Sequence, residues 1–263
     1  MDLPLNLTVI TICFNNKEDL ILTCRSVDEQ SRKPFEHLII DGSSDGKIRH
    51  FLENSTPPSY RKWISERDNG IADAFNKGIR NAKGNIVVML NAGDGFYDNY
   101  SLSNALKAFE EQPQISWVHG KYKLLRGDQW VIIGKPFEKK KLYRGMRSIC
   151  HQSMFVRKAL HDRYGLYNPD VKIAMDYDFL CRIGDEPFAF LNTPLISFAP
   201  GGISSANYLQ SLKETKKVYE RHFGKSLKLD LWQVRLKVLF YLLHSPAGNF
   251  LYKIKTGMKA ENL

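Results

Sequence analysis

Apolar runs that end in polar turns alternate with stretches of helical periodicity through the first third of the chain. The run from Leu7 to Phe14 is rich in β-branched residues and stops at Asn15 and Asn16, which is typical of a buried strand followed by a helix start. Similar runs predict strands at 36–41, 62–65 and 85–90, and the periodicity between them favours helices at 19–30, 48–52 and 70–82. This alternation argues for a parallel sheet that is covered by helices on both faces.

Polar side chains gather where the predicted strands end. In sheets of this kind, ligands bind beyond the carboxyl ends of the strands. The residues at these ends are Asn15, Asp41, Ser43, Asp45, Glu66, Asp68, Asn91 and Asp94. A role in solubility does not explain clustered acids in a chain whose net charge is +10. Such acids need a cation, or a ligand rich in hydroxyl donors such as ribose or another sugar. For Asp41 and Asp45, ordinary turn chemistry is the alternative explanation.

Composition narrows the class of protein. The chain has 263 residues, 43% of them hydrophobic and 25% charged, which excludes a disordered chain, a collagen-like repeat and a small disulfide scaffold. The longest unbroken apolar stretch, Val238 to Leu243, is far shorter than the roughly 18 residues that a membrane span needs. The first residues lack the pattern of a signal peptide, so we expect a cytosolic protein in which the four scattered cysteines are buried free thiols.

The middle of the chain changes character. The segments 115–119 and 130–134 predict two further strands, joined by a turn at Gly127–Asp128. The following stretch, 135–147, is dense in positive charge, and we interpret it either as a solvated loop or as a lid over a diphosphate. His151 and Gln152 then open an apolar strand that runs to Val156.

The last fifth of the chain is basic and apolar at once. From Tyr208 onward, eleven Lys and Arg residues stand against four Asp and Glu. Between 226 and 244 a narrow polar stripe at helical spacing interrupts an otherwise apolar helix. A wide apolar face with basic flanks is typical of a helix that lies on an anionic membrane. The same pattern would serve a helix packed on the main domain or on a second subunit, and the sequence leaves these alternatives open.

Seven segments of the sequence resemble one enzyme family when they are taken in order. They are Thr8–Asn15, Ile40–Gly46, Ser65–Gly78, Gly84–Asp94, His151–Gln152, Ile173–Arg182 and Gly201–Ser205. Their order resembles that of the inverting glycosyltransferases of family 2, especially those that build bacterial surface polysaccharides. The resemblance implies the α/β fold called GT-A, a Rossmann-like nucleotide-diphospho-sugar transferase fold in which helices flank a mixed, mainly parallel sheet. We therefore expect a GT-A domain over 1–223, with a nucleotide-sugar-binding half (1–98) and an acceptor-binding half (99–223), and a helical tail over 224–263.

The resemblance also assigns the donor side of a site. It implies a nucleotide-sugar pocket for UDP-sugar lined by Thr11, Asn15, Asp41, Asp68 and Asn91, with Lys77 as a further positive charge; a lysine on the helix surface is the alternative for Lys77. Asp94 stands where the family carries its acidic metal motif, so the cofactor would be Mn²⁺ or Mg²⁺. Only one position of that motif is acidic here, and we therefore expect the substrate phosphates and water to hold most of the metal.

On the acceptor side, the candidate general base is Asp176. It lies at the predicted N-terminus of an amphipathic helix, where the helix stabilises a carboxylate anion. Asp178 is interpreted as its structural neighbour. The resemblance places His151 and Gln152 beside the acceptor or the metal, although a hydrogen-bonded core histidine is equally compatible with the sequence.

These inferences predict a metal-dependent enzyme that passes a sugar from UDP to a hydroxyl of a polyprenyl-diphosphate-linked saccharide. The product would belong to a bacterial surface polysaccharide such as O-antigen, capsule or exopolysaccharide. The tail would hold the protein on the inner face of the cell membrane. A soluble or protein acceptor, with the tail forming a homodimer contact, is the alternative. Nucleic acid is not expected as a partner, because the predicted clefts carry acids where a phosphate track needs Lys and Arg. A sugar-binding relative without activity is a further alternative.

Overall fold

The predicted alternation of strands and helices is confirmed in the first half of the protein. A computed structural model describes residues 4–126, 129–147, 149–199, 207–245 and 248. The elements of this half are β1 (Leu7–Cys13), α1 (Lys17–Asp28), β2 (Glu36–Asp41), α2 (Lys47–Asn54), β3 (Arg61–Ser65), α3 (Ile71–Asn81) and β4 (Ile86–Met89). Each lies within three residues of its predicted bounds.

The second half contains elements that the sequence pattern did not reveal. Its elements are β5 (Gly95–Phe96), α4 (Ser101–Glu111), β6 (Trp117–Arg126), β7 (Gln129–Ile133), the 3-10 helices η1 (Lys139–Arg144) and η2 (His151–Ser153), β8 (Met154–Arg157), α5 (Ala159–Tyr164), α6 (Met175–Ile183), β9 (Phe188–Ser197), α8 (Tyr208–Phe223) and α9 (Leu227–Leu243). The elements that were not predicted are β5, α4, η1, α5, β9 and α8. His151 and Gln152 form a 3-10 turn before β8 rather than its first residues.

A mixed sheet organises both halves. The strand order is β3-β2-β1-β4-β8-β6-β9-β5, with β7 paired to β6. The pairs among β3, β2, β1 and β4 are parallel, whereas β8 is antiparallel to both β4 and β6. From β1 the chain first adds β2 and β3 on one side and then places β4 on the other. The carboxyl ends of β1 and β4 therefore flank a topological switch point, where open α/β sheets bind their ligands.

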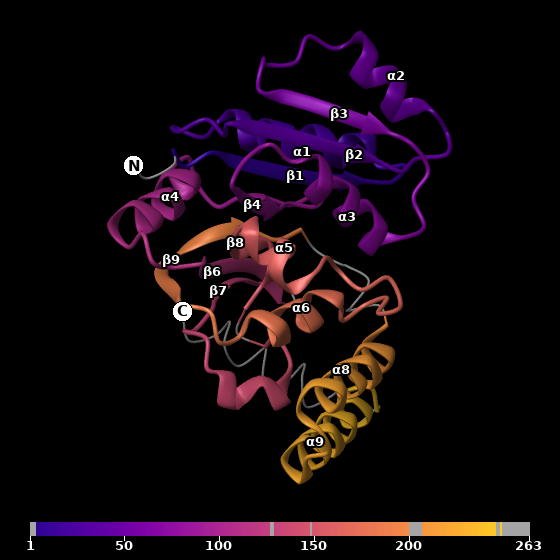
Figure 1. The fold of residues 1–263 in the computed structure, drawn as a ribbon. Helices are drawn as coiled ribbons and strands as arrows, with labels where there is room; N and C mark the ends of the chain where they lie inside the picture. The colour runs from indigo at the N-terminus through magenta and orange to yellow at the C-terminus, as the bar shows by residue number, and fades with distance from the viewer. Residues whose placement is uncertain (1–3, 127–128, 148, 200–206, 246–247, 249–263) are drawn as a thin grey trace, which may run out of the picture.

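Helices cover both faces of the sheet (Figure 1). One core joins α3 and α6 to the sheet, and within it the Ile10 side chain of β1 touches α3 so closely that a side chain at Gly78 would overlap it. A second core packs α4 on the opposite face, and a third joins α1 and α2. The four cysteines are buried free thiols, as predicted.

The two C-terminal helices form a pair at the end of the molecule away from α2 and β3 (Figure 1). α8 contacts α6, and α9 contacts both α8 and η1. Within the described ranges, no helix is both long enough and apolar enough to cross a bilayer. The predicted domain boundary at residue 223 coincides with the end of α8 and stays a prediction. The predicted turn at Gly127–Asp128, the segment Gly201–Ser205 and the end of the tail, 249–263, lie outside the described residues.

Candidate active site

A cleft of about 1020 Å³ opens at the switch point between β1 and β4. Its walls include the loops after both strands, the start of α3, the N-terminus of α6, and side chains of α8 and α9. Four of the predicted site residues line it: Asp68, Asn91, His151 and Asp176. The cleft thus joins residues from the predicted nucleotide half to residues from the predicted acceptor half.

Asn15, a predicted donor-side residue, connects the loops that follow β1 and β2. It has a φ of 54°, a left-handed conformation that asparagine adopts more readily than most residues. Its backbone N–H donates to Ser43 Oγ at 2.8 Å, and its side-chain oxygen accepts from the N–H of Ser44 at 3.3 Å. Asn15 therefore fixes the loop after β1 against the loop after β2.

Two predicted pocket residues turn inward instead. Thr11 is fully buried, and its hydroxyl lies 3.0 Å from Nε2 of His37 on the neighbouring strand. Asp41 is also buried, with one oxygen accepting from the N–H of Ser43 at 3.0 Å and the other from the hydroxyl of Ser65 at 2.8 Å. Neither side chain lines the cleft. Asp41 stabilises the turn after β2, which was the alternative explanation for this residue.

Asp68 reaches the cleft because Gly42 makes room for it. A side chain at Gly42 would overlap the Asp68 carboxylate, so only glycine lets the loop after β2 approach so closely. Asp68 Oδ1 accepts from the N–H of Gly70 at 3.0 Å, immediately before α3. Its second oxygen, Oδ2, faces the glycine.

Lys77 is held by the protein's own acids. Its ammonium lies 3.1 Å from Glu66 and 3.7 Å from Asp73, and it donates to the carbonyl of Arg67 at 2.5 Å. Lys77 is not among the residues that line the cleft. The structure therefore favours a role in fixing the loop before α3 over the predicted contact with the nucleotide.

Asp94 and Gln152 form a buried pair beneath the cleft. Asp94 Oδ2 accepts a hydrogen bond from Nε2 of Gln152, and Oδ1 accepts from the backbone N–H of Ala199 at 2.7 Å. Burial raises the pKa of Asp94 to about 6, although both hydrogen bonds and nearby His151 act in the opposite direction. A carboxylate whose charge is this poorly solvated gains strongly from a neighbouring cation.

The donor set fits a hard cation that is held mainly by substrate. Asn91 Oδ1 is buried and has no hydrogen-bond partner in the described part of the chain, and Asn91 lines the cleft. Asp94 and Asn91 would together supply two hard oxygen ligands to such a cation. No group of three or more His, Cys, Asp or Glu side chains suited to a metal occurs among the described residues. Mg²⁺ and similar ions are commonly bound by one or two protein oxygens together with phosphates and water.

Asp176 lies in the first turn of α6, as predicted. Its Oδ1 accepts from the N–H of Tyr177 at 2.8 Å, and its Oδ2 lies 3.3 Å from Nδ1 of His151. The start of α6 is held from α8, because Glu214 Oε2 accepts from the N–H groups of Ile173 at 2.7 Å and Ala174 at 3.2 Å. A carboxylate on a rigid, capped helix end has a well-defined direction.

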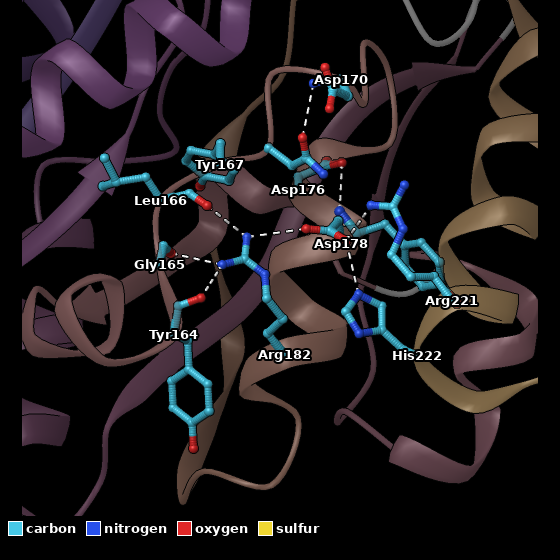
Figure 2. A network of polar contacts seen from close by, with 12 residues as sticks. Tyr164, Gly165, Leu166, Tyr167, Asp170, Asp176, Asp178, Arg182, Arg221 and His222 are labelled. Atoms are coloured by element: carbon cyan, nitrogen blue, oxygen red, sulfur yellow. Dashed lines mark hydrogen bonds and ion pairs between the residues drawn. The ribbon is translucent and has the colours of Figure 1, made fainter.

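Asp178 is structural, as expected. It is buried and lies 3.2 Å from Arg182 in its own helix and 2.9 Å from Nε2 of His222 in α8, with Arg221 at 3.9 Å (Figure 2). Arg182 also donates to the carbonyls of Gly165 at 2.8 Å and Leu166 at 2.9 Å (Figure 2). This network ties α6 to α8 and to the loop after α5.

The structure adds residues that sequence reasoning missed. The cleft is also lined by two aromatic side chains, Phe14 (59% exposed) and Phe75, and by the basic side chains of Arg144, Arg147 and Lys172. Phe14 directly follows β1, so its position at a strand end could have indicated it. The two arginines belong to the positively charged stretch 135–147, where the sequence showed the charge but not that these side chains point into the cleft.

A comparison with known families agrees with this geometry. The family model described as "Glycosyl transferase family 2" matches residues 8–165. The chain belongs to this family. The match begins in β1 and ends after α5, so it contains the switch point together with Asp94, His151 and Gln152.

Relatives with known sequences are glycosyltransferases too. An uncharacterised glycosyltransferase of Mycobacterium tuberculosis is 33% identical over 179 residues, which are 66% of this chain and 67% of the relative. A PGL/p-HBAD biosynthesis glycosyltransferase of Mycobacterium bovis is 28% identical over 164 residues, which are 62% of this chain and 63% of the relative. The family 2 protein described here is therefore a glycosyltransferase.

Solved structures show the same GT-A fold at low sequence identity. The mannosyltransferase PcManGT from Pyrobaculum calidifontis, in complex with GDP-Man and Mn²⁺, has a TM-score of 0.63 at 17% identity, covering 96% of this chain and 80% of that one. S. aureus TarS 1-349 in complex with UDP-GlcNAc has a TM-score of 0.61 at 14% identity, covering 87% and 70%. The expected mixed α/β GT-A fold is confirmed.

Proposed function

We propose that this glycosyltransferase moves a sugar from a UDP-sugar to a hydroxyl of a polyprenyl-diphosphate-linked saccharide, with inversion at the anomeric carbon. The observation that carries the proposal is the continuous cleft. It is lined by Asp68 and Asn91 on the donor side and by His151 and Asp176 on the other. Donor and acceptor can therefore meet in one cavity beside a carboxylate.

The donor side suits a nucleotide. Asp68 accepts hydrogen bonds from a uracil N–H or from ribose hydroxyls, and exposed Phe14 offers a face on which a base can stack. Asn15 and Asp41 contribute indirectly, since they hold the loops that shape the pocket. The neighbour TarS was solved with UDP-GlcNAc, which supports a uridine donor, whereas the neighbour PcManGT was solved with GDP-Man.

Asp94 and Asn91 would hold a divalent cation, Mn²⁺ or Mg²⁺, together with the phosphates of the donor. When bound, such a cation offsets the negative charge that develops on the leaving diphosphate. The neighbour PcManGT was solved with Mn²⁺, which supports this assignment. Gln152 orients Asp94 by its hydrogen bond to Oδ2.

Asp176 acts as the general base in this proposal. It takes the proton of the acceptor hydroxyl while that oxygen forms a bond to the anomeric carbon, opposite the diphosphate. The bond between the sugar and the diphosphate breaks, and its electron pair leaves with UDP. Because a single displacement reverses the configuration, the product is inverted. His151 keeps the Asp176 carboxylate directed into the cleft.

The surface of α9 supports a lipid-linked acceptor at the inner face of the cell membrane. Its polar residue Gln233 faces inward with Leu229 and Leu236, so the apolar stripe faces outward. This stripe consists of the exposed side chains Leu227, Leu231, Val234, Val238, Tyr241 and Leu242. Lys228, Arg235 and Lys237 flank it at helical spacing. An apolar stripe with basic flanks complements an anionic membrane surface.

Thermal-shift titrations with UDP, GDP, CDP and dTDP, each with Mn²⁺ or EDTA, test the donor. A ligand that binds only the folded protein raises its melting temperature, so we expect a shift of several degrees for UDP with Mn²⁺. A shift for GDP instead would overturn the uridine assignment. An equal UDP shift in EDTA would overturn the metal site.

Sedimentation with vesicles tests the surface of α9. The double variant Leu231→Gln/Val238→Gln should lose binding to anionic vesicles, because both side chains belong to the exposed stripe. Leu22→Gln is the matched control, since Leu22 is 55% exposed on α1. The wild type could instead stay in solution and form a dimer, seen by light scattering, that the double variant loses. In that case the tail is a subunit contact, and the alternative of a soluble acceptor is favoured.

A further inference from the structure

Three arginines surround one tryptophan where α9 meets η1. The guanidinium carbons of Arg144, Arg147 and Arg235 lie 5.2, 5.4 and 5.2 Å from the ring centroid of Trp232. Trp232 and Arg235 belong to α9, whereas Arg144 ends η1 and Arg147 follows it. Two segments almost ninety residues apart in sequence thus build one cluster of positive charge.

The cluster lacks acidic partners. None of its three guanidinium groups forms an ion pair with any carboxylate in the described ranges, and Arg144 only donates from Nε to the hydroxyl of Tyr143 at 2.9 Å. The nearby acid of α9, Asp230, is paired with Lys216 of α8 instead. Because all three carbons lie within 5.4 Å of one point, no two of them are more than about 11 Å apart, and their like charges repel.

The indole explains how the arginines are held together. The ring face attracts each guanidinium group, which partly offsets the repulsion. Tyr143 packs edge-on against the same ring at 6.3 Å between centroids. The arrangement keeps three forked donors in place without neutralising their charge.

The cluster lies at the edge of the cleft, which two of its arginines line. Arg144 and Arg147 line it together with Lys172, and the α9 residues Gln233 and Leu236 line it as well. Arg235 is the link to the outer surface, because it also flanks the apolar stripe of α9. A ligand at the cluster can therefore extend into the cleft on one side and along the stripe on the other.

We propose that Arg144, Arg147 and Arg235 bind the diphosphate that joins the acceptor's saccharide to its lipid. Arginine forks pair with phosphate oxygens through two parallel hydrogen bonds, and three of them more than offset the two negative charges of a diphosphate that is esterified at both ends. The saccharide then points toward Asp176, and the lipid leaves along α9. This assignment rests on the proposed transfer to a lipid-linked acceptor and adds where the carrier is recognised.

The test uses full-length protein with saturating UDP and Mn²⁺, so that the donor side is occupied. The probes are phosphatidylcholine vesicles that carry either a polyprenyl diphosphate or phosphatidylglycerol at equal total charge. We expect the wild type to bind the diphosphate vesicles at least tenfold more tightly. Arg147→Gln and Arg235→Gln should each weaken this binding about tenfold. Lys217→Gln, an exposed lysine on α8 outside the cluster, is the matched control and should bind as the wild type does.

The outcomes separate this inference from the proposed function. Equal binding to both vesicles would mean that the arginines recognise lipid headgroups in general, and the diphosphate assignment would be overturned. A loss of the UDP thermal shift in the arginine variants would place the cluster on the donor side, which also overturns it. The absence of any UDP shift in the wild type would instead contradict the proposed donor, while the vesicle comparison would still decide the role of the cluster.

Discussion

The imidazole of His151 lies against the carboxylate of Asp176, with 3.3 Å between Nδ1 and Oδ2. The two residues come from a 3-10 turn before β8 and from the N-terminus of α6, so the contact joins the sheet to the helix. Nε2 of His151 is buried without a hydrogen-bond partner in the described chain. Since a carboxylate only accepts, the contact is favourable when Nδ1 carries the ring proton.

Replacing Asp176 by Asn should lower kcat by about 10²- to 10⁴-fold, because the amide cannot take the acceptor's proton. The UDP thermal shift should remain, since Asp176 does not belong to the donor side. Asp170→Asn is the matched control, because Asp170 is an exposed carboxylate in the loop before α6 (Figure 2). Turnover near the wild-type rate in Asp176→Asn would exclude this residue as the base.

His151→Asn and His151→Leu separate positioning from packing. Asn presents an N–H near the place of Nδ1, whereas Leu fills the volume without a donor. If His151 directs Asp176, kcat should fall strongly in the leucine variant and less in the asparagine variant. A role in packing alone would give no such difference between the two variants.

Gly42→Ala should weaken UDP binding with little effect on the fold. The new methyl group would overlap the Asp68 carboxylate, which must then leave its place beside the donor side of the cleft. We expect an increase in the UDP dissociation constant of about tenfold, measured by calorimetry. Gly46→Ala is no suitable control, because Gly46 has a φ of 70°. Gly184→Ala serves instead, because Gly184 has a φ of −65° and its methyl group would contact Leu180 and Phe137 at 3.3 Å rather than Asp68.

His119→Leu should stabilise the protein, and more so in acid. His119 is fully buried between aromatic rings, and neither ring nitrogen has a partner among the described residues. Removing two unpaired polar atoms should add about 1 kcal/mol to the free energy of unfolding at pH 7.5. Burial lowers the pKa of His119 to about 4, so the unfolded chain gains a proton first as the pH falls below 6.5.

The wild type therefore loses stability through this residue between pH 6.5 and 4, and the variant does not. At pH 5 the difference should grow by about 2 kcal/mol, measured by urea unfolding at both pH values. If the difference in unfolding free energy between the two proteins stays constant from pH 7.5 to 5, His119 takes up its proton as readily in the folded protein as in the unfolded chain, and the prediction is wrong.

Local patterns predicted the β/α half of the fold because each of its elements can be recognised from its own residues. The strands β1, β2 and β4 are short apolar runs, and α3 has a clear apolar face. In the second half, β9 pairs in parallel with β6 although some sixty residues separate the two strands. No local sequence pattern predicts such a distant pairing. The predicted role of residues 135–147 as a lid stays untested, and part of this stretch forms η1.

The candidate site was predicted in part for a related reason. Asp68, Asn91 and Asp176 follow strands or start a helix, and they do reach the cleft. Thr11 and Asp41 also lie near strand ends, but their side chains face His37 and Ser65 across the sheet. Sequence position gives the end of the strand, whereas the direction of the side chain depends on the register with the next strand. The cluster around Trp232 depends on a tertiary contact between η1 and α9, which no spacing in the sequence encodes.

Two sets of side-chain contacts hold α8 against α6, so the helix pair α8 and α9 is firmly connected to the helix that carries Asp176. Glu214 accepts hydrogen bonds from the two residues that precede α6, and Nε2 of His222 lies 2.9 Å from Asp178, two residues beyond Asp176. Because α9 packs on α8, a force on α9 acts on the helix that carries Asp176. Docking of the apolar stripe of α9 on a surface would therefore exert a torque on α6 and so on the Asp176 carboxylate.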